Sequence, residues 1–386
     1  MALMSDRLLL RGARIVTPDA RLEPANVLVE DGRIAEVGIS ISALDAQAVD
    51  LAGLILAPGF IDLHVHGGGG FSLITTDPAE IAAYRSWAPS RGVTAFLATV
   101  CATDIVAAAK CLRTVAAAGE AFGAVLLGAN LEGPFVSDER RGALPRSWPA
   151  TPDVPAFEHL LDAAGDTLRV MTVAPELDGA PKLIARALGE SVRVSVGHTD
   201  ATFDQARAAF KAGATQVTHA FNAMRPFHHR DPGPIGAALE SEGVIVEVIA
   251  DGVHLHPATV RTLVQAFGHD RITLITDGVT PAGLGAGTFR IGDVEATLHG
   301  GEMRLPDGTI AGSVATMVDV VRNVVRWGIA DIATAATMAS ATPARAVSLD
   351  AAKGRIAPGY DADLVALTDD LTVAQTWVAG RLAYTA

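Results

Sequence analysis

Eight short runs of β-branched and aliphatic residues alternate along this 386-residue chain with segments that suit helices. The runs lie at residues 61–66, 94–100, 125–132, 168–175, 192–198, 216–221, 244–251 and 271–277. Most are continuously apolar, which is typical of parallel strands that are buried on both faces. Helix candidates between them lie at 78–91, 104–118, 202–212 and 257–267. Eight strand–helix units in series predict an α/β fold, a (β/α)8 TIM-like barrel.

A doubly wound open sheet is the alternative fold. It would need a glycine-rich phosphate-binding turn directly between the first strand and a helix. Four consecutive glycines, Gly67–Gly70, do follow the first run, but their pattern favours a flexible loop. The barrel is therefore the preferred prediction.

The two ends of the chain have a different pattern. Short alternating runs occupy residues 7–56, with a hairpin turn predicted at Asp31-Gly32, and residues 353–385 return to the same style. We expect residues 1–57 and 353–386 to pair into one small flanking β-sandwich domain. The catalytic barrel would then span 58–352, with a β insertion near 287–312.

The composition excludes several classes of protein. A net charge of −13 argues against nucleic acid or an anionic membrane as the main partner. No apolar run reaches the roughly 18 residues that a membrane span needs. Residues 1–7 lack the order of a secretion signal, so a cytoplasmic location is expected. Cys101 and Cys111 lack a CxxC spacing and are interpreted as buried or half-buried thiols.

Histidines and carboxylates gather at the ends of the apolar runs. His64 and His66 are two residues apart in the first run, so both rings face the same side of a strand. Similar residues end or follow later runs, namely Glu132, His198, His219, Asp251, His254 and Asp277. Because the strand ends of a barrel converge on one face, a shared metal site is predicted there.

The residue types indicate the chemistry of this site. Imidazoles and carboxylates suit a divalent metal, with zinc expected first and iron, manganese or cobalt as alternatives. Such a metal lowers the pKa of bound water towards ~7 and polarises a carbonyl oxygen. A carboxylate, for which Asp277 is the candidate, then carries a proton from the water to a leaving nitrogen. The predicted reaction is hydrolysis of an amide or a related bond.

Six segments, with a closing motif at residues 353–365, carry a resemblance to a known family. They read Pro58-Gly59-Phe60-Ile61-Asp62-Leu63-His64-Val65-His66-Gly67, Leu131-Glu132-Gly133-Pro134-Phe135, Gly197-His198-Thr199-Asp200, Thr218-His219-Ala220-Phe221-Asn222-Ala223-Met224, Ala250-Asp251-Gly252-Val253-His254 and Thr276-Asp277-Gly278. From about residue 8 to residue 382 the chain resembles the amidohydrolase superfamily and, more narrowly, its N-acetylglucosamine-6-phosphate deacetylases. The resemblance implies a homodimer that removes acetate from N-acetylglucosamine 6-phosphate to give glucosamine 6-phosphate.

The same resemblance implies one or two metal ions per subunit. The principal ion would be held by Glu132, His198 and His219. His64 and His66 would hold a second ion, bridged through Glu132, or would only orient other groups by hydrogen bonds. Asp277 matches the family's proton acceptor and donor and is also expected among the metal ligands.

Substrate-binding positions follow from the same matching. Asn222, Ala223 and Arg230 correspond to positions that hold the sugar phosphate. The Arg230 guanidinium would donate charge-assisted, bidentate hydrogen bonds to it. The segment from Asp251 to His254 is another substrate segment, in which His254 polarises the acetyl carbonyl or binds a sugar hydroxyl. Backbone contacts to the substrate are implied for Ile310, Ala311 and Gly312.

One substrate segment departs from the family pattern. Where the family commonly has Lys-Lys-Gly-Ala-His, this chain has Arg140-Arg141-Gly142-Ala143-Leu144, so that Ala143 and Leu144 stand at substrate positions. Leu144 cannot donate a hydrogen bond to a sugar hydroxyl. The epimer N-acetylgalactosamine 6-phosphate is therefore an alternative substrate, or His228 or His229 supplies the contact.

Two further classes of function are open. A dihydroorotase-like or D-aminoacylase-like amidohydrolase would share His64 and His66 but would not need the phosphate positions around Arg230. A non-catalytic sugar-phosphate-binding protein is the other class, although binding alone needs no proton-carrying carboxylate such as Asp277.

Overall fold

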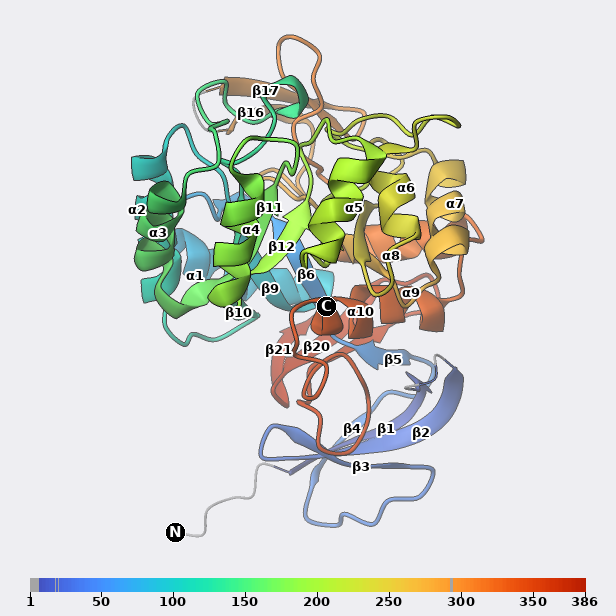
Figure 1. Cartoon of the computed structure of the whole chain (residues 1–386). Helices are drawn as coiled ribbons and strands as arrows, with labels where there is room; N and C mark the ends of the chain where they lie inside the picture. Colours follow the sequence, from blue (N-terminus) through green and yellow to red (C-terminus); the bar gives the residue numbers. More distant parts are fainter. Residues whose placement is uncertain (1–6, 18, 20, 292–293) are drawn as a thin grey trace.

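The structure is a computed structural model, and it describes residues 7–17, 19, 21–291 and 294–386 (Figure 1). The residues used to argue against a secretion signal lie mostly in 1–6, outside the described residues. Within the described part of the chain, no helix combines the length and the apolar character that crossing a bilayer requires.

Eight parallel strands form the barrel that the sequence predicted. They are β6 (Phe60–Val65), β9 (Val93–Val100), β10 (Val125–Glu132), β11 (Leu168–Val173), β12 (Arg193–Val196), β13 (Gln216–Val217), β14 (Ile245–Ile249) and β15 (Ile272–Ile275). They are hydrogen-bonded in chain order. A parallel bridge between Val65 and Gly278 closes the ring between its first and last strands.

The sixth apolar run is a strand over only its first two residues. The prediction of a strand across 216–221 was therefore too long. Beyond Val217, the backbone dihedral φ of His219 is +28° and that of Phe221 is +70°, which is the left-handed region and cannot continue a strand. The chain instead turns at the point where His219 enters the candidate site.

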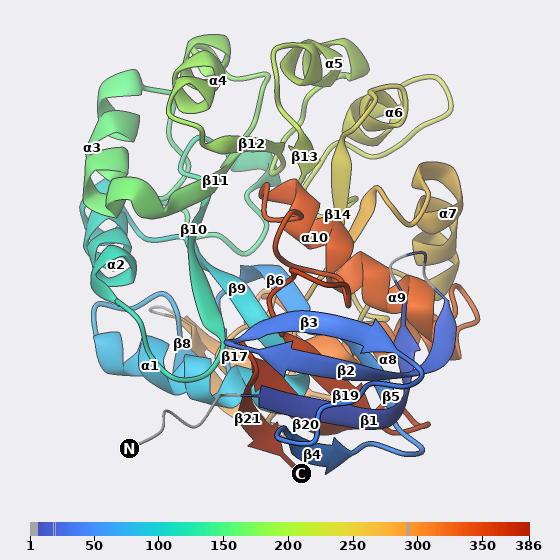
Figure 2. The ribbon, with the colours of Figure 1, turned by 90° about the horizontal axis from the view of Figure 1, so that it is seen from below.

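Most of the helices form an outer layer around the barrel, whereas the last one, α10 (Ala341–Ala346), packs across one end of it (Figure 2). The helices before it are α1 (Pro78–Trp87), α2 (Ile105–Ala117), α3 (Val154–Ala164), α4 (Ala180–Gly189), α5 (Phe203–Lys211), α6 (Gly233–Leu239), α7 (Pro257–Phe267), α8 (Met317–Arg326) and α9 (Ile332–Ala339). Local sequence sets several starts, since the Asp104 side chain accepts a hydrogen bond from Ala107 N and Thr202 forms a capping box with Gln205. The helix predicted over 78–91 is confirmed as α1, followed by a separate 3-10 turn at Ala88–Arg91.

Both chain ends join one eight-stranded sheet beside the barrel (Figure 2). From the N-terminal end come β1 (Arg7–Val16), β2 (Leu22–Glu30), β3 (Arg33–Gly38), β4 (Gln47–Asp50) and β5 (Ile55–Pro58), and from the C-terminal end β19 (Leu364–Leu367), β20 (Val373–Val378) and β21 (Arg381–Thr385). The two ends meet where β5 pairs antiparallel with β19. The pairing of the ends and the Asp31-Gly32 hairpin are confirmed, whereas the proposed domain boundaries stay a prediction.

The β insertion after the eighth strand lies on the side of the barrel opposite the flanking sheet (Figure 1). It contains β16 (Gly287–Ile291), β17 (Val294–His299) and β18 (Glu302–Arg304) as an antiparallel sheet, and residues 292 and 293 lie outside the described residues.

The four consecutive glycines do not form the flexible loop that their sequence indicated. Residues 67–72 form a small antiparallel ladder between β7 (Gly67–Gly68) and β8 (Phe71–Ser72). A Cβ atom added to Gly68 would lie 2.5 Å from the Trp87 ring, and one added to Gly69 would lie 2.6 Å from it. The glycines are thus required because the Trp87 indole packs directly on the backbone.

Candidate metal centre and substrate site

The predicted metal ligands meet at the carboxyl ends of the barrel strands. His64 lies in β6 and Glu132 is the last residue of β10, while His198, His219 and Asp277 each lie two residues beyond a strand. Those three residues have φ values of +45°, +28° and +50°. Non-glycine residues seldom adopt this left-handed backbone, and it is concentrated at functional sites. The sharp turns direct all three side chains into one cluster.

Glu132 lies at the centre of the cluster. Its Oε1 atom is 3.0 Å from His198 Nε2, 3.2 Å from His219 Nε2 and 3.3 Å from His64 Nε2. Its Oε2 atom is 3.4 Å from His66 Nε2. One carboxylate therefore faces histidines from both halves of the predicted ligand set.

A second carboxylate faces His64 and His66, at the end of the first strand. Asp277 Oδ1 lies 3.5 Å from His64 Nε2 and 3.3 Å from His66 Nε2. The possible ligand atoms of His64, His66 and Asp277 all lie within 4.8 Å of one another, as do those of Glu132, His198 and His219. The structure thus brings together two adjacent groups of three donors, and Glu132 lies between them.

The hydrogen bonds of the imidazole rings test whether these groups fit a cation. His66 Nδ1 lies 3.1 Å from Thr99 O, and His198 Nδ1 lies 2.9 Å from Arg140 O. A carbonyl oxygen only accepts, so each Nδ1 carries a proton, and in the neutral ring Nε2 is left to present a lone pair to the cluster.

Three inward nitrogen atoms converge on a single carboxylate oxygen, Glu132 Oε1. His198 Nε2 is 3.0 Å from His219 Nε2. The buried Nε2 atom of His64 has no hydrogen-bond partner among the described residues. Lone pairs that face one another are unfavourable unless a positive charge lies between them. The residues present therefore fit a divalent metal, and the outer hydrogen bonds are those that orient metal-binding histidines.

The charges of the cluster are strongly coupled. Burial alone would lower the pKa of His64, but the carboxylates of Glu132 and Glu247 outweigh it and raise that pKa well above its usual value. Burial would raise the pKa of Glu132, yet His64, His198 and His219 hold it well below its usual range. The pKa of Asp277 is also lowered, because contact with His66 outweighs burial. Both carboxylates are consequently anionic at neutral pH and attract a cation.

Two residues near the cluster were missed in the sequence. Glu247 lies in β14, where its Oε2 atom is 3.1 Å from His64 Nδ1 and accepts a hydrogen bond from His219 N at 3.2 Å. A lone carboxylate in an otherwise apolar run was a usable signal for it. Cys101, interpreted from the sequence as a buried or half-buried thiol, has Sγ within 4.8 Å of ligand atoms of His66 and Glu132.

The predicted pair of Asp251 and His254 forms a connected unit beyond β14. Asp251 Oδ2 lies 2.7 Å from His254 Nδ1 and accepts a hydrogen bond from Ser313 Oγ at 2.9 Å. Ser313 N in turn donates to Asp277 O at 2.9 Å. The segment from Ile310 to Gly312 is therefore fixed next to the Asp277 backbone, and Ser313 is a further residue that the sequence did not indicate.

The remaining predicted substrate residues lie around this centre at different depths. Ala223 O accepts a hydrogen bond from Thr199 N, and the amide of the half-buried Asn222 donates to the His219 carbonyl at 3.2 Å. Arg230 is exposed, and its Nη1 atom is 2.8 Å from His229 Nε2. The structure places Arg230 in an exposed loop and does not place it in contact with the metal-ligand cluster.

The segment that departs from the family pattern packs beside His198. A Cβ atom on Gly142 would lie 3.7 Å from His198 Cε1 and 3.4 Å from Ala223 Cβ. Ala143 is exposed, whereas the side chain of Leu144 is buried in the main apolar cluster. Both His228 and His229, the suggested replacements for a histidine at this place, are exposed.

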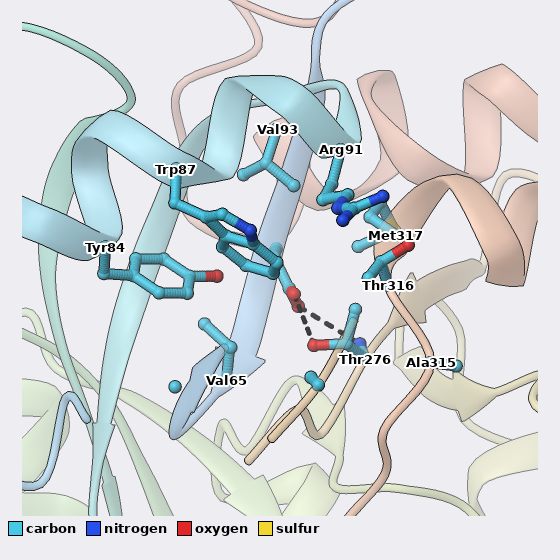
Figure 3. Close-up of a pocket in the computed structure, with 12 residues that line it drawn as sticks. Val65, Tyr84, Trp87, Arg91, Val93, Thr276, Ala315, Thr316 and Met317 are labelled. Atoms are coloured by element: carbon cyan, nitrogen blue, oxygen red, sulfur yellow. Dashed lines mark hydrogen bonds between the residues drawn. The ribbon is translucent and has the colours of Figure 1, made fainter. Parts of the chain in front are cut away.

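Two cavities differ in what they can hold. An open cavity of about 520 Å³ lies beside His254 and has Phe221, Met224 and Phe227 in its wall. A cavity of about 10 Å³ near Tyr84 and Trp87 is at the lower limit for one water molecule, so it is no substrate site (Figure 3).

Asp62 lines the small cavity near Tyr84 and Trp87. Its carboxylate accepts hydrogen bonds from Thr276 Oγ1 at 2.6 Å and Thr276 N at 3.2 Å. Burial raises the pKa of Asp62 to about 7, although these hydrogen bonds oppose the rise. Asp62 thus connects the first strand to the residue that directly follows the last one.

Comparison with known proteins identifies the family. The model of the amidohydrolase family matches residues 55–383. The chain is 36% identical to the N-acetylglucosamine-6-phosphate deacetylase of Bacillus subtilis, covering 99% of this chain and 98% of that protein. It is also 36% identical to the N-acetylgalactosamine-6-phosphate deacetylase of Escherichia coli O157:H7, covering 97% and 98%.

A solved structure supports the same relationship. The N-acetyl-D-glucosamine-6-phosphate deacetylase of Mycobacterium smegmatis, solved as a variant with N-acetyl-D-glucosamine 6-phosphate bound, superposes with a TM-score of 0.89. It is 35% identical, and the match covers 99% of this chain and 100% of that one. The barrel, the donor cluster and these matches together show that this chain belongs to the amidohydrolase family.

Proposed function

We propose that this protein hydrolyses the N-acetyl group of N-acetylglucosamine 6-phosphate to give glucosamine 6-phosphate and acetate. The observation that carries the proposal is the position of Asp277, an anionic carboxylate 3.3 Å from His66 Nε2, in a chain that matches deacetylases over its whole length. A protein that only bound sugar phosphates would not need a buried carboxylate in that place.

The proposed centre binds one or two divalent ions per subunit. Glu132, His198 and His219 would hold the principal ion, and His64, His66 and Asp277 would hold a second one, with Glu132 between them. When bound, such ions acidify water and polarise a carbonyl oxygen. We propose zinc from the donor types, with iron, manganese and cobalt as alternatives that metal analysis of the purified protein distinguishes.

Asp277 carries the proton in the proposed mechanism. Its lowered pKa keeps the carboxylate ionised at neutral pH, so it can accept a proton from the water that attacks the acetyl carbon. The same carboxyl then donates that proton to the amide nitrogen as the C–N bond breaks, which releases the amine and leaves acetate.

His254 would assist this reaction as a hydrogen-bond donor. Asp251 holds its Nδ1 atom at 2.7 Å and raises the pKa of the imidazole against the effect of burial. The protonated ring then has its second N–H available for the acetyl carbonyl or a sugar hydroxyl. The open cavity beside His254 gives a sugar ring an apolar wall at Phe221 and Met224.

The phosphate is assigned to Asn222, Ala223 and Arg230. Arg230 is an exposed cation that is available for a charge-assisted bond with phosphate. Backbone groups of Ile310, Ala311 and Gly312, together with Ala143 and Leu144, complete the proposed substrate contacts.

Deacetylation of N-acetylgalactosamine 6-phosphate is the second candidate function. Leu144 stands where the family commonly has histidine, and the chain is as similar to the Escherichia coli enzyme named for that epimer, at 36% identity, as it is to the Bacillus subtilis one. Both candidates use the same metal centre and differ only in the contact to one sugar hydroxyl.

Acetate release tests these proposals. We expect the metal-replete protein to release acetate fastest from N-acetylglucosamine 6-phosphate, more slowly from its epimer and hardly at all from unphosphorylated N-acetylglucosamine. A faster reaction with the epimer would favour the second candidate. Equal rates with and without phosphate would contradict the phosphate assignment, and no turnover of any of the three would contradict the enzymatic function.

Assembly, location and domain boundaries are further parts of the proposal. We propose a homodimer, as the resemblance implies, and a native mass measurement tests it. A cytoplasmic location and a flanking domain made of 1–57 and 353–386 complete the proposal, and cell fractionation and limited proteolysis test them.

A further inference from the structure

Cys101 occupies a position equivalent to that of the predicted metal ligands. It directly follows β9 (Val93–Val100) at the carboxyl face of the barrel. This strand lies between β6, which His66 directly follows, and β10, which ends at Glu132. Its side chain is half-buried, and its Sγ atom lies within 4.8 Å of ligand atoms of both residues. Because His66 Nδ1 donates to the Thr99 carbonyl, the His66 Nε2 lone pair faces the same interior.

An independent observation points to a ligand at this place. His64 Nε2 is buried and lacks a hydrogen-bond partner among the described residues, although it lies 3.3 Å from Glu132 Oε1 and 3.5 Å from Asp277 Oδ1. A buried imidazole nitrogen in that state costs free energy unless it binds something. The same two carboxylates also face His66, which lies next to Cys101. A cation bound by His64 and these carboxylates would therefore lie near Cys101 as well.

We infer that the Cys101 thiolate is an additional ligand of the second metal ion, beside the histidines and carboxylates already assigned to it. Coordination replaces the thiol proton by the metal, since a coordinating thiol is deprotonated. A sulfur ligand makes the site favour zinc or cobalt over manganese, because thiolates are soft donors. The inference rests on the proposed metal centre but not on the proposed substrate.

Cys111 offers a matched control. It lies in α2 and is buried in the main apolar cluster, and burial raises the pKa of its thiol. Within the described residues it belongs to none of the groups of possible metal ligands. Replacing it removes the same chemical group without touching the proposed site.

Cobalt spectroscopy of the full-length protein tests the inference. Metal-free protein is titrated with Co²⁺ while bound cobalt is measured by elemental analysis. We expect a sulfur-to-cobalt charge-transfer band in the near ultraviolet in the parent protein and in Cys111→Ala, and its absence in Cys101→Ser. Cys101→Ser should also bind its second cobalt ion roughly 10-fold or more weakly, since even the loss of an outer partner has such an effect.

The outcomes separate the cysteine inference from the metal proposal. Two cobalt ions per chain without the band, or a band that persists in Cys101→Ser, would overturn the role of Cys101 alone. Failure of the parent protein to bind any cobalt would overturn both the metal centre and this inference. One bound ion with a band that depends on Cys101 would support the thiolate ligand and contradict the two-ion centre.

Discussion

Glu247 Oε2 lies 3.1 Å from His64 Nδ1, and both side chains are buried. A carboxylate in this place makes the imidazole a stronger ligand and fixes the orientation of its ring. Glu247→Gln keeps the shape but removes the charge. We expect this substitution to lower the affinity for the second metal ion by about 10–100-fold, as the loss of such an outer hydrogen-bond partner typically does.

Competition with a chelator measures the effect of Glu247→Gln. Glu240→Gln, at an exposed position after α6, is the control and should leave metal affinity unchanged. Unchanged affinity in Glu247→Gln as well would mean that Glu247 only packs against His64.

Asp277→Asn tests the proposed proton transfer. We expect the rate of acetate release to fall by about 10²–10⁴-fold, because asparagine cannot accept the proton from water. The ion held by Glu132, His198 and His219 should stay bound, since Asp277 is outside that group of donors. Elemental analysis and single-turnover kinetics on one sample give both readouts, and loss of that ion with turnover preserved would refute the assignment.

Arg230→Ala tests the phosphate contact. A hydrogen bond to a charged group contributes roughly 1.5–3 kcal/mol, so the KM for the phosphorylated substrate should rise by about 10–100-fold. The unphosphorylated sugar should be affected much less. Arg207→Ala on α5, which removes a half-buried arginine that pairs with Asp204, is the control. An equal loss with both sugars would place Arg230 outside the phosphate site.

The sequence predicted the strands and most of the metal site for the same physical reason. Parallel strands buried on both faces leave continuous apolar runs, and a barrel brings all their carboxyl ends to one face. A polar residue at the end of a run, such as Glu132 or His198, was therefore recognisable without coordinates.

Other features depend on how strands rotate around the barrel and could not be predicted. The contact between His64 and Glu247 joins residues 183 positions apart and requires both side chains to point inward at the same level. Ser313 reaches Asp251 only because the chain returns from the β insertion to the rim. The glycines after the first strand looked like a loop because sequence patterns do not reveal that Trp87 lies over them.

Gly69→Ala tests the requirement for a bare backbone beneath Trp87. Its φ of +64° disfavours a side chain, and the new Cβ would lie 2.6 Å from the indole. We expect the free energy of unfolding to fall by about 1–3 kcal/mol, as overpacking does. Gly189→Ala, at the exposed end of α4 with no atom within 4 Å of the new Cβ, should be neutral or slightly stabilising. Denaturant unfolding measures the free energy of unfolding of both variants. If Gly69→Ala were as stable as Gly189→Ala, the ladder between β7 and β8 would be able to accommodate the new Cβ atom.

Asp251→Asn should change the pH dependence of the reaction. Burial lowers the pKa of His254, while the hydrogen bond and charge of Asp251 raise it above its usual value. Asparagine at position 251 removes the negative charge, while His254 stays buried. The pKa of His254 should therefore fall. If protonated His254 donates to the acetyl carbonyl, kcat/KM of the parent protein should decline only as the pH rises through the raised pKa of His254. In Asp251→Asn the decline on the alkaline side then begins at a lower pH.

A pH profile of kcat/KM measures this shift. Asp204→Asn, at an exposed position on α5, should keep the parent profile. If the alkaline limb of Asp251→Asn coincides with that of the parent, the protonated ring is not required, and His254 would act through a sugar hydroxyl as a neutral imidazole. The presence or absence of the shift thus distinguishes the two roles proposed for His254, since only the contact to the acetyl carbonyl makes the rate depend on its charge.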